Sequence, residues 1–271
     1  MYRSLNNLLG HRLAAIDGEI GKVKDALFDD LQWCVRYLVA STGRWLPGRR
    51  VLLSPASLGC PDSAKDLIPV ALTREQIKDA PGVSADLPVS RQEEAELVEY
   101  YGGPIYWGPP GAAFGIAATR LPPATRVPPA RTAEKLGVVP KDAPGQTEEA
   151  TGDPHLRSMN EVLGYHIQVQ DGEIGHVEDF LVRNAEWAIR YVVADTRNWL
   201  PGRKVLLVPR WFSGVSWQES KVFVAQHRQA IQNSPEYDPT RPLEGEYEQQ
   251  IRAYCDSLEI RAGDLPASDE S

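Results

Sequence analysis

An internal repeat constrains this chain more than any other feature of its sequence. Shifted by 154 positions, residues 3–55 align without a gap on residues 157–209, and about half of the aligned positions are identical. The same register continues as far as the pair Tyr100 and Tyr254. A unit of about 100 residues that occurs twice indicates tandem domains, because the repeats of solenoid proteins are shorter.

The repeat divides the chain into four predicted parts. Residues 1–101 form a first unit, 102–154 a linker, 155–262 a second unit and 263–271 a polar, disordered tail. The linker holds ten of the 22 prolines. Because proline fixes φ and lacks an amide donor, we expect this segment to run extended outside any sheet.

Each unit begins with a run of strand patterns. RLAAI and EIGKVKDALF flank Asp17-Gly18, and Asp171-Gly172 repeats this dipeptide, which is typical of a tight hairpin turn. WCVRYLVAS, VLLSP and LIPVAL follow, rich in β-branched and aromatic residues. Five such strands, with no room for crossover helices, predict a small closed or partly closed barrel in each unit.

Three further features complete the predicted unit. Gly21 and Gly175 indicate a bulge or a close approach of strands. TREQIKDAP is a predicted helix with Thr73 as its N-cap, and EGEYEQQIRAYCDSL is a predicted amphipathic helix. The expected fold class is therefore mainly β with peripheral helices, arranged as two tandem small barrels.

The two units resemble the PRC-barrel domain family. The resemblance rests on the combination of G-x-I-G-x-V-x-D with W-L-P-G-R, in LLGHRLAAIDGEIGKVKDALF through WLPGRRVLLSP and in its copy. This family includes the cytoplasmic barrel of photosynthetic reaction-centre H subunits and the C-terminal barrel of a ribosome maturation factor. The resemblance implies a non-catalytic module that docks onto another macromolecule.

The doubled motif WLPGRR and WLPGRK offers the candidate partner interface. Pro47-Gly48 and Pro201-Gly202 suit the central positions of a type II turn, so the motif is first of all a strand connection. A cation next to such a turn is expected to point outward and, beside a tryptophan, to serve as an interface hot spot. The candidate interface residues are Trp45, Arg49, Trp199 and Arg203.

Two acid–base pairs are identical in both units. Asp25 with Arg36, and Asp179 with Arg190, lie in neighbouring predicted strands. We expect cross-strand ion pairs on the barrels; half of a polar docking surface is the alternative.

The linker aromatics allow two interpretations. Tyr100, Tyr101, Tyr106, Trp107 and Phe114 alternate with glycine and proline. They are predicted to cover an apolar seam between the units, and docking on a groove of a partner is the alternative.

No cofactor, metal or catalytic site is predicted. The three cysteines and five histidines show no metal-ligand spacing, and the chain has no phosphate loop, nucleophile elbow or dinucleotide fingerprint. An enzymatic function would need a deep pocket with convergent titratable groups. No run of about 18 apolar residues or secretory leader is found, so we expect a cytoplasmic protein.

Two binding functions compete at this point. The first is a soluble adaptor or scaffold for a protein partner, with homo-oligomerisation and a place at a membrane periphery or electron-transfer complex left open. The second is a ribosome- or RNA-associated assembly factor. With a net charge of −8, and neither unit basic, direct contact with nucleic acid is not expected.

Overall fold

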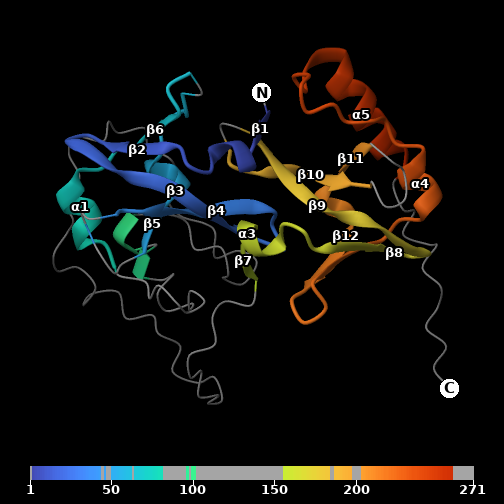
Figure 1. Cartoon of the computed structure of the whole chain (residues 1–271), viewed down its shortest axis with the longest axis horizontal. Coiled ribbons are helices and arrows are strands. Elements are labelled where there is room, and N and C mark those ends of the chain that lie inside the picture. The colour runs from blue at the N-terminus through green and yellow to red at the C-terminus, as the bar shows by residue number, and fades with distance from the viewer. Residues whose placement is uncertain are drawn as a thin grey trace, which may run out of the picture. The chain divides into compact units, whose positions relative to one another are not determined.

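The computed structural model of the chain is mainly β, with two sheets and few helices. It describes residues 2–43, 46, 50–62, 64–81, 96–97, 99–101, 155–183, 186–196 and 203–258. We call residues 2–101 the first half and residues 155–258 the second half. Figure 1 shows the first half in blue to green and the second in yellow to red.

The sheet of the first half has the strand order β5-β4-β3-β2-β6, with β7 paired to β3. Its strands are β2 (Arg12–Ala15), β3 (Gly18–Asp29), β4 (Cys34–Ser41), β5 (Val51–Leu53), β6 (Leu67–Pro69) and β7 (Leu156–Ser158). The five predicted strands of the first unit are confirmed. Their inner faces are apolar and buried, as in Leu13, Ile20, Leu38 and Leu53.

The sheet of the second half has the order β11-β10-β9-β8-β13-β12, with β1 paired to β9. Its strands are β1 (Tyr2–Ser4), β8 (His166–Val169), β9 (Gly172–Arg183), β10 (Ile189–Asp195), β11 (Lys204–Leu207), β12 (Phe212–Ser216) and β13 (Lys221–Val224). The long strands β3 and β9 both have 12 residues and begin 154 positions apart. Bounds of matching elements therefore follow the register of the sequence alignment.

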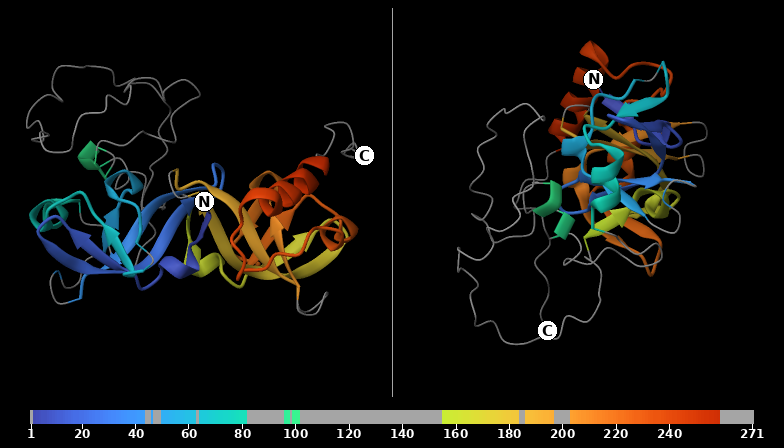
Figure 2. Two further views of the ribbon diagram at one scale, coloured as in Figure 1. Left: turned by 90° about the horizontal axis from the view of Figure 1, so that it is seen from above. Right: turned by 90° about the vertical axis from the view of Figure 1, so that its left-hand side faces the viewer.

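Helices cover only part of each half. They are α1 (Arg74–Asp79), α3 (Met159–Val162), α4 (Arg228–Gln232) and α5 (Gly245–Ser257). Thr73 caps α1 through a capping box with Gln76, so the predicted helix start is confirmed. Helix α5 buries one face, including Ile251, and lies beside α4 and the second-half sheet (Figures 1 and 2).

Two glycines allow the long strands to pass close to a neighbouring strand. A Cβ atom on Gly21 would lie 2.0 Å from the Ser41 carbonyl oxygen, and one on Gly175 would lie 2.0 Å from that of Asp195. Both glycines have φ near 140°, and the ladder shifts register beside each of them. The predicted bulge and close approach are confirmed.

The N-terminal strands are exchanged between the halves. Strand β1 pairs with β9 of the second half, and β7 pairs with β3 of the first. Leu181 and Val182 of β9 are paired with residues of β1 as well as with residues of β10. Strand β1 therefore lies along the side of β9 opposite to β10. These pairings were absent from the sequence prediction, which treated each unit as complete by itself.

The exchange explains why the two compact units of the chain differ from its two sequence halves. One compact unit contains Met1–Gly10, Asp25–Arg36 and Arg157–Ser271, and the other contains His11–Lys24 and Tyr37–Leu156. The first of these units therefore combines segments that are distant in the sequence. It contains β1, the C-terminal end of β3 and all of β9.

A candidate interaction surface

Most of the doubled WLPGR motif falls outside the described residues. This applies to Trp45, Arg49, Trp199, Pro47, Gly48, Pro201 and Gly202. Arg203 is described, and its guanidinium donates to the carbonyl oxygens of Gln232, at 2.8 Å, and Ser234 at the end of α4. Arg203 thus satisfies carbonyl groups at the end of the helix, and its part in a partner interface stays a prediction.

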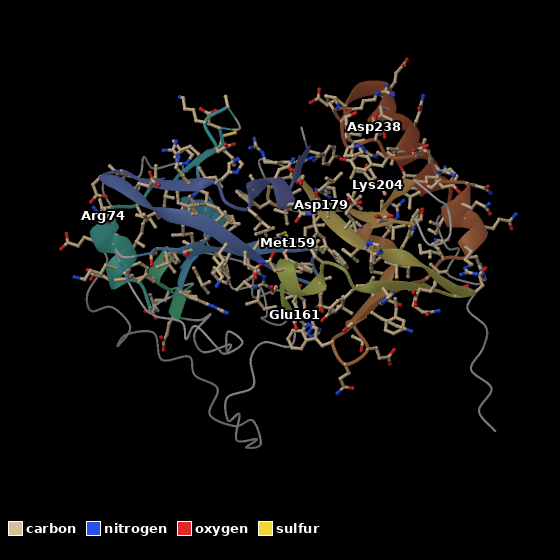
Figure 3. The ribbon with its side chains drawn as sticks, in the orientation of Figure 1. Arg74, Met159, Glu161, Asp179, Lys204 and Asp238 are labelled. Carbon is tan, nitrogen blue, oxygen red and sulfur yellow. The ribbon has the colours of Figure 1, made fainter. Side chains whose placement is uncertain are left out.

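The Asp-Gly dipeptides have a structural function. β2 and β3 form an antiparallel hairpin around Asp17-Gly18, as β8 and β9 do around Asp171-Gly172. The Asp17 carboxylate also accepts from the backbone amide of Arg74, and Asp171 accepts from that of Arg228 in the same way, both at 2.7 Å. Figure 3 labels Arg74, which lies at the start of α1. The predicted hairpins are confirmed, and the carboxylates tie them to the helices.

The predicted ion pairs of Asp25 with Arg36 and of Asp179 with Arg190 are not the contacts that these residues make. Arg36 pairs with Asp29 in a buried site, and Arg190 pairs with Glu186 at 2.7 Å on the surface. The alignment could not anticipate this, since residue 29 is an aspartate in the first half and its counterpart, Arg183, is a cation.

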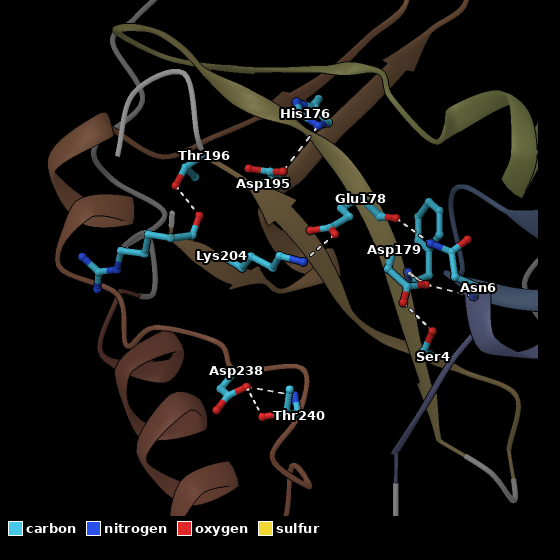
Figure 4. Close-up of polar contacts among 12 residues, drawn as sticks. Ser4, Asn6, His176, Glu178, Asp179, Asp195, Thr196, Lys204, Asp238 and Thr240 are labelled. Carbon is cyan, nitrogen blue, oxygen red and sulfur yellow. Dashed lines mark hydrogen bonds and ion pairs between the residues drawn. The ribbon is translucent and has the colours of Figure 1, made fainter. Parts of the chain in front are cut away.

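Asp25 and Asp179 instead bind the exchanged segments. Asp179 accepts from the Ser4 hydroxyl and, at 3.1 Å, from the Asn6 amide, as Figure 4 shows. Asp25 accepts from the Ser158 hydroxyl at 2.6 Å and from the Asn160 amide at 3.1 Å.

Burial raises the pKa of Asp179, and its hydrogen bonds from Ser4, Asn6 and Phe180 oppose this rise. Through their hydrogen bonds, Asp179 holds the start of the first half and Asp25 holds the start of the second half.

A reciprocal contact also joins the turns that follow the two long strands. The amide of Val35 donates to the Trp187 carbonyl at 2.9 Å, and the amide of Ile189 donates to the Trp33 carbonyl at 2.7 Å. Both tryptophans are buried and have positive φ, 52° and 54°. Beneath the turns, the Phe28 and Phe180 rings pack 5.1 Å apart.

Two exposed apolar residues of the same compact unit, Leu31 and Trp217, are connected through Arg157, whose own side chain is 11% exposed. Arg157 is the link: its Nε is 2.6 Å from the Asp30 carboxylate, and its guanidinium lies 4.4 Å from the centre of the Trp217 ring. The Leu31 side chain is 68% exposed and that of Trp217 is 37% exposed. We call these three residues the Leu31–Trp217 patch.

Hydrogen bonds, an ion pair and ring packing support the turn that carries Leu31. Asp29 accepts from the amides of Leu31 and Gln32 at 2.8 and 2.7 Å, and its carboxylate is held by buried Arg36. Trp33, two residues after Leu31, packs 4.6 Å from the Phe212 ring of β12. Leu31 is therefore exposed on a turn in which the amides of Leu31 and Gln32 both have an acceptor.

Sequence reasoning missed the patch, although a signal was present. Leu31 aligns with Ala185, and Trp217 aligns with Ser63, so each large apolar residue has a small counterpart in the other half. A large apolar residue in a polar turn, found in only one of two related units, can mark a surface specific to that unit. The link through Arg157 could not be read from the sequence, because it joins three distant segments.

A second feature of the same compact unit is a hollow of about 500 Å³ beside the edge of β11. We call it the β11 hollow; the residues that form it include Lys204, Glu236, Tyr237, Asp238, Arg241 and Tyr247. Lys204 reaches back to Glu178 of β9, with 2.5 Å between Nζ and Oε1 (Figure 4). Asp238 holds its own turn by accepting from the Thr240 amide and hydroxyl.

The aromatics at the end of the first half contact that half. Tyr100 donates its hydroxyl to the Gln76 carbonyl at 2.6 Å, and Tyr101 donates to the Leu52 carbonyl at 2.9 Å. Tyr106, Trp107 and Phe114 lie outside the described residues, so a role for them at a seam or in docking stays a prediction.

Among the described residues, no group of three or more His, Cys, Asp or Glu side chains is arranged to hold a metal ion. Within that same part of the chain, no helix combines the length and apolar character needed to cross a membrane. No protein-family model matches the sequence, and no curated protein matches it.

Proposed function

We propose that this chain is a tandem PRC-type β-barrel protein that acts without catalysis, as an adaptor that binds a protein partner through the Leu31–Trp217 patch. The family and the barrel closure are part of this proposal. They are supported by the sequence motifs and by the strand bounds, which correspond between the halves at an offset of 154.

The observation that carries the proposal is the exposure of Leu31 and Trp217 on a fixed support. Isolated exposed apolar side chains are common, but here Trp217 lies against the guanidinium of Arg157, and Leu31 directly follows Asp30, the residue with which Arg157 is paired. Tryptophan and arginine are enriched at the centres of protein interfaces. The patch is thus suited to an apolar surface of a protein partner.

The support is as relevant as the exposed residues. Ordering a mobile surface segment on binding costs free energy and lowers the affinity. A partner that binds a segment already held in place avoids this cost. The Asp29 acceptor, the Arg157 ion pair and the Trp33–Phe212 contact all restrict the patch. An adaptor needs such a preformed contact surface.

The test is capture of partners from the native host by the tagged full chain, with mass spectrometry. Leu31→Ser with Trp217→Ser is expected to lose the partner and to keep the wild-type melting temperature within a few degrees. Ile16→Ser is the matched control, since Ile16 is 71% exposed on the hairpin tip between β2 and β3. Equal capture by all three proteins would contradict the proposal.

The ribosome-associated alternative is tested in the same extract. It predicts that the chain sediments with ribosomal particles and that the patch variant abolishes this co-sedimentation. Retention of the variant on ribosomes would support that alternative through another surface and contradict the role given to the patch.

A further inference from the structure

The contacts that hold the two halves together occur in matching pairs. Ser4 and Ser158, which align at the offset of 154, each donate a hydroxyl to an aspartate on the long strand of the other half. The amides of Val35 and Ile189 align in the same way, and each donates to a tryptophan carbonyl of the other half. Matching contacts in both directions are the property of a twofold interface, in which one surface pairs with an equivalent surface.

The exchanged strands complete sheets to which they do not belong by sequence. β1 and β7 have three residues each, and each pairs with a long strand of 12 residues, β1 with β9 and β7 with β3. Without its exchanged strand, the end of each long strand would expose unpaired backbone N–H and C=O groups on that side. Each half therefore needs a segment that another half supplies.

The connection between the halves does not decide which molecule supplies that segment. The described part of the first half ends at Tyr101, that of the second begins at His155, and 53 residues lie between them. A chain of that length can reach up to about 170 Å, which is several times the diameter of a small domain. A half of one molecule can therefore pair with the other half of the same molecule or with that of a second one.

The Leu31–Trp217 patch is divided between the halves in the same way. Leu31 and Asp30 belong to the first half, whereas Arg157 and Trp217 belong to the second. When halves of two molecules pair, each patch takes residues from both molecules, and the resulting particle carries two patches. Two patches on one particle bind a multivalent partner more tightly than one patch does, without any new contact.

We propose that a second molecule of this chain is a binding partner, and that two molecules pair by exchange, with β1 of each on β9 of the other and β7 of each on β3 of the other. The contacts are those of the single molecule, so the connected half of each molecule competes with the second molecule. The effective concentration of a connected half is about millimolar or lower, and it falls as the connection lengthens. The pairing stands on these contacts, and only the role of the two patches rests on the proposed adaptor function.

A disulfide trap tests which molecule supplies β1. Tyr2 and Arg183 are directly paired residues of β1 and β9, so cysteines at both positions lie within the reach of a disulfide. Tyr2→Cys with Arg183→Cys is unfolded, refolded at about 1 µM and at about 500 µM, oxidised and run on a non-reducing gel. The covalent dimer is expected to be at least about tenfold more abundant after refolding at the higher concentration. The unaltered chain, which keeps Cys34, Cys60 and Cys255, is the control for other disulfides.

The unaltered chain gives a second measurement that needs no substitution. After refolding at the same two concentrations, its mass is measured in solution by size-exclusion chromatography with light scattering. We expect 30.0 kDa after refolding at the lower concentration, and a clear fraction at twice that mass after refolding at the higher one. Chains that carry two different affinity tags and are refolded together are expected to be captured together only from that second fraction.

Leu31→Ser and Trp217→Ser, made in separate chains, test whether the patch is shared. A mixed exchanged dimer unites the intact Leu31 of one chain with the intact Trp217 of the other. Refolding the two variants together at about 500 µM is therefore expected to restore capture of the protein partner, whereas mixing them after separate refolding is not.

Disulfides that stay within one molecule at both concentrations, with a mass of 30.0 kDa throughout, would overturn the inference. A dimer of the unaltered chain without the covalent dimer of the cysteine variant would also overturn it, because another surface would then join the molecules. Both results would leave the adaptor proposal standing. A trapped dimer whose mixed form does not restore capture would keep the exchange and contradict the role of the patch.

Discussion

The turn after β3 and the turn after β9 occupy matching positions in the two halves, but their charges are arranged in opposite ways. In the first half, Asp29 and Arg36 form a buried pair whose side chains are 6% and 3% exposed. In the second half, Glu186 and Arg190 form a surface pair whose side chains are 47% and 46% exposed. The first half therefore has a buried ion pair at this place in the sequence, and the second half has a solvated one.

The two aligned positions 29 and 183 also differ in their ability to accept hydrogen bonds. Asp29 satisfies the amides of Leu31 and Gln32, whereas Arg183, at the matching position, has no side-chain acceptor to offer. Burial removes Asp29 and Arg36 from water, so each depends on its partner. The first turn is thus fixed by buried electrostatics, and fixing it presents Leu31 to a partner.

Removing one member of the buried pair gives the largest expected effect. We expect Asp29→Ala to lower the free energy of unfolding by about 3–5 kcal/mol, because Arg36 loses its buried counter-charge and two turn amides lose their acceptor. Urea titration followed by tryptophan fluorescence measures this. Glu186→Ala is the matched control and should leave the urea midpoint nearly unchanged. Similar midpoint shifts for Asp29→Ala and Glu186→Ala would contradict the claim that the two ion pairs differ in their contribution to stability.

A double-mutant cycle gives a smaller but more specific effect. Asp29→Ala and Arg36→Ala, singly and together, are expected to show a coupling energy of about 2–3 kcal/mol, because the second substitution removes a charge that the first has left unpaired. The same cycle on Glu186 and Arg190 is expected to show no measurable coupling. If the effects of the two substitutions on the free energy of unfolding were additive in the first cycle, the interaction between Asp29 and Arg36 would contribute little to stability.

The sequence was sufficient for the features that depend on local patterns. The Asp17-Gly18 hairpin, the close approach at Gly21 and the N-cap at Thr73 each follow from a few neighbouring residues. The five strands β2 to β6 were predicted as well, because a run rich in β-branched and aromatic residues is a local signal.

The partners of distant residues were not predictable in this way. Asp25 and Asp179 bind serines of the other half, and Arg203 binds carbonyl groups at the end of α4. Each of these contacts depends on which segments the topology brings together, and a single sequence does not encode that as a pattern. The Leu31–Trp217 patch was missed for the same reason, since Arg157 joins segments that are 127 residues apart.

Asp179 differs from Asp29 in two ways: it is only partly buried, and it is held by a hydroxyl and two backbone amides instead of a cation. Burial raises its pKa above the ordinary value for aspartate, so the folded state binds more protons than the unfolded state between these two values. The contribution of Asp179 to stability is therefore most favourable at low pH and declines as the pH rises through this window.

Replacing Asp179 by asparagine should remove this pH dependence, with an effect within about 1 kcal/mol. Urea unfolding of both proteins between about pH 4 and pH 6 measures it. The stability of the wild type relative to Asp179→Asn is expected to fall as the pH rises. An opposite slope would show that the hydrogen bonds of the carboxylate outweigh its burial.

The central claim, that a partner binds the Leu31–Trp217 patch, is tested most directly by hydrogen–deuterium exchange of the complex with the captured partner. The account predicts slower exchange in peptides that cover residues 29–36 and 212–221, with the β2–β3 hairpin tip around Ile16 unchanged. Protection that is absent from both of these segments and appears elsewhere on the chain would contradict it.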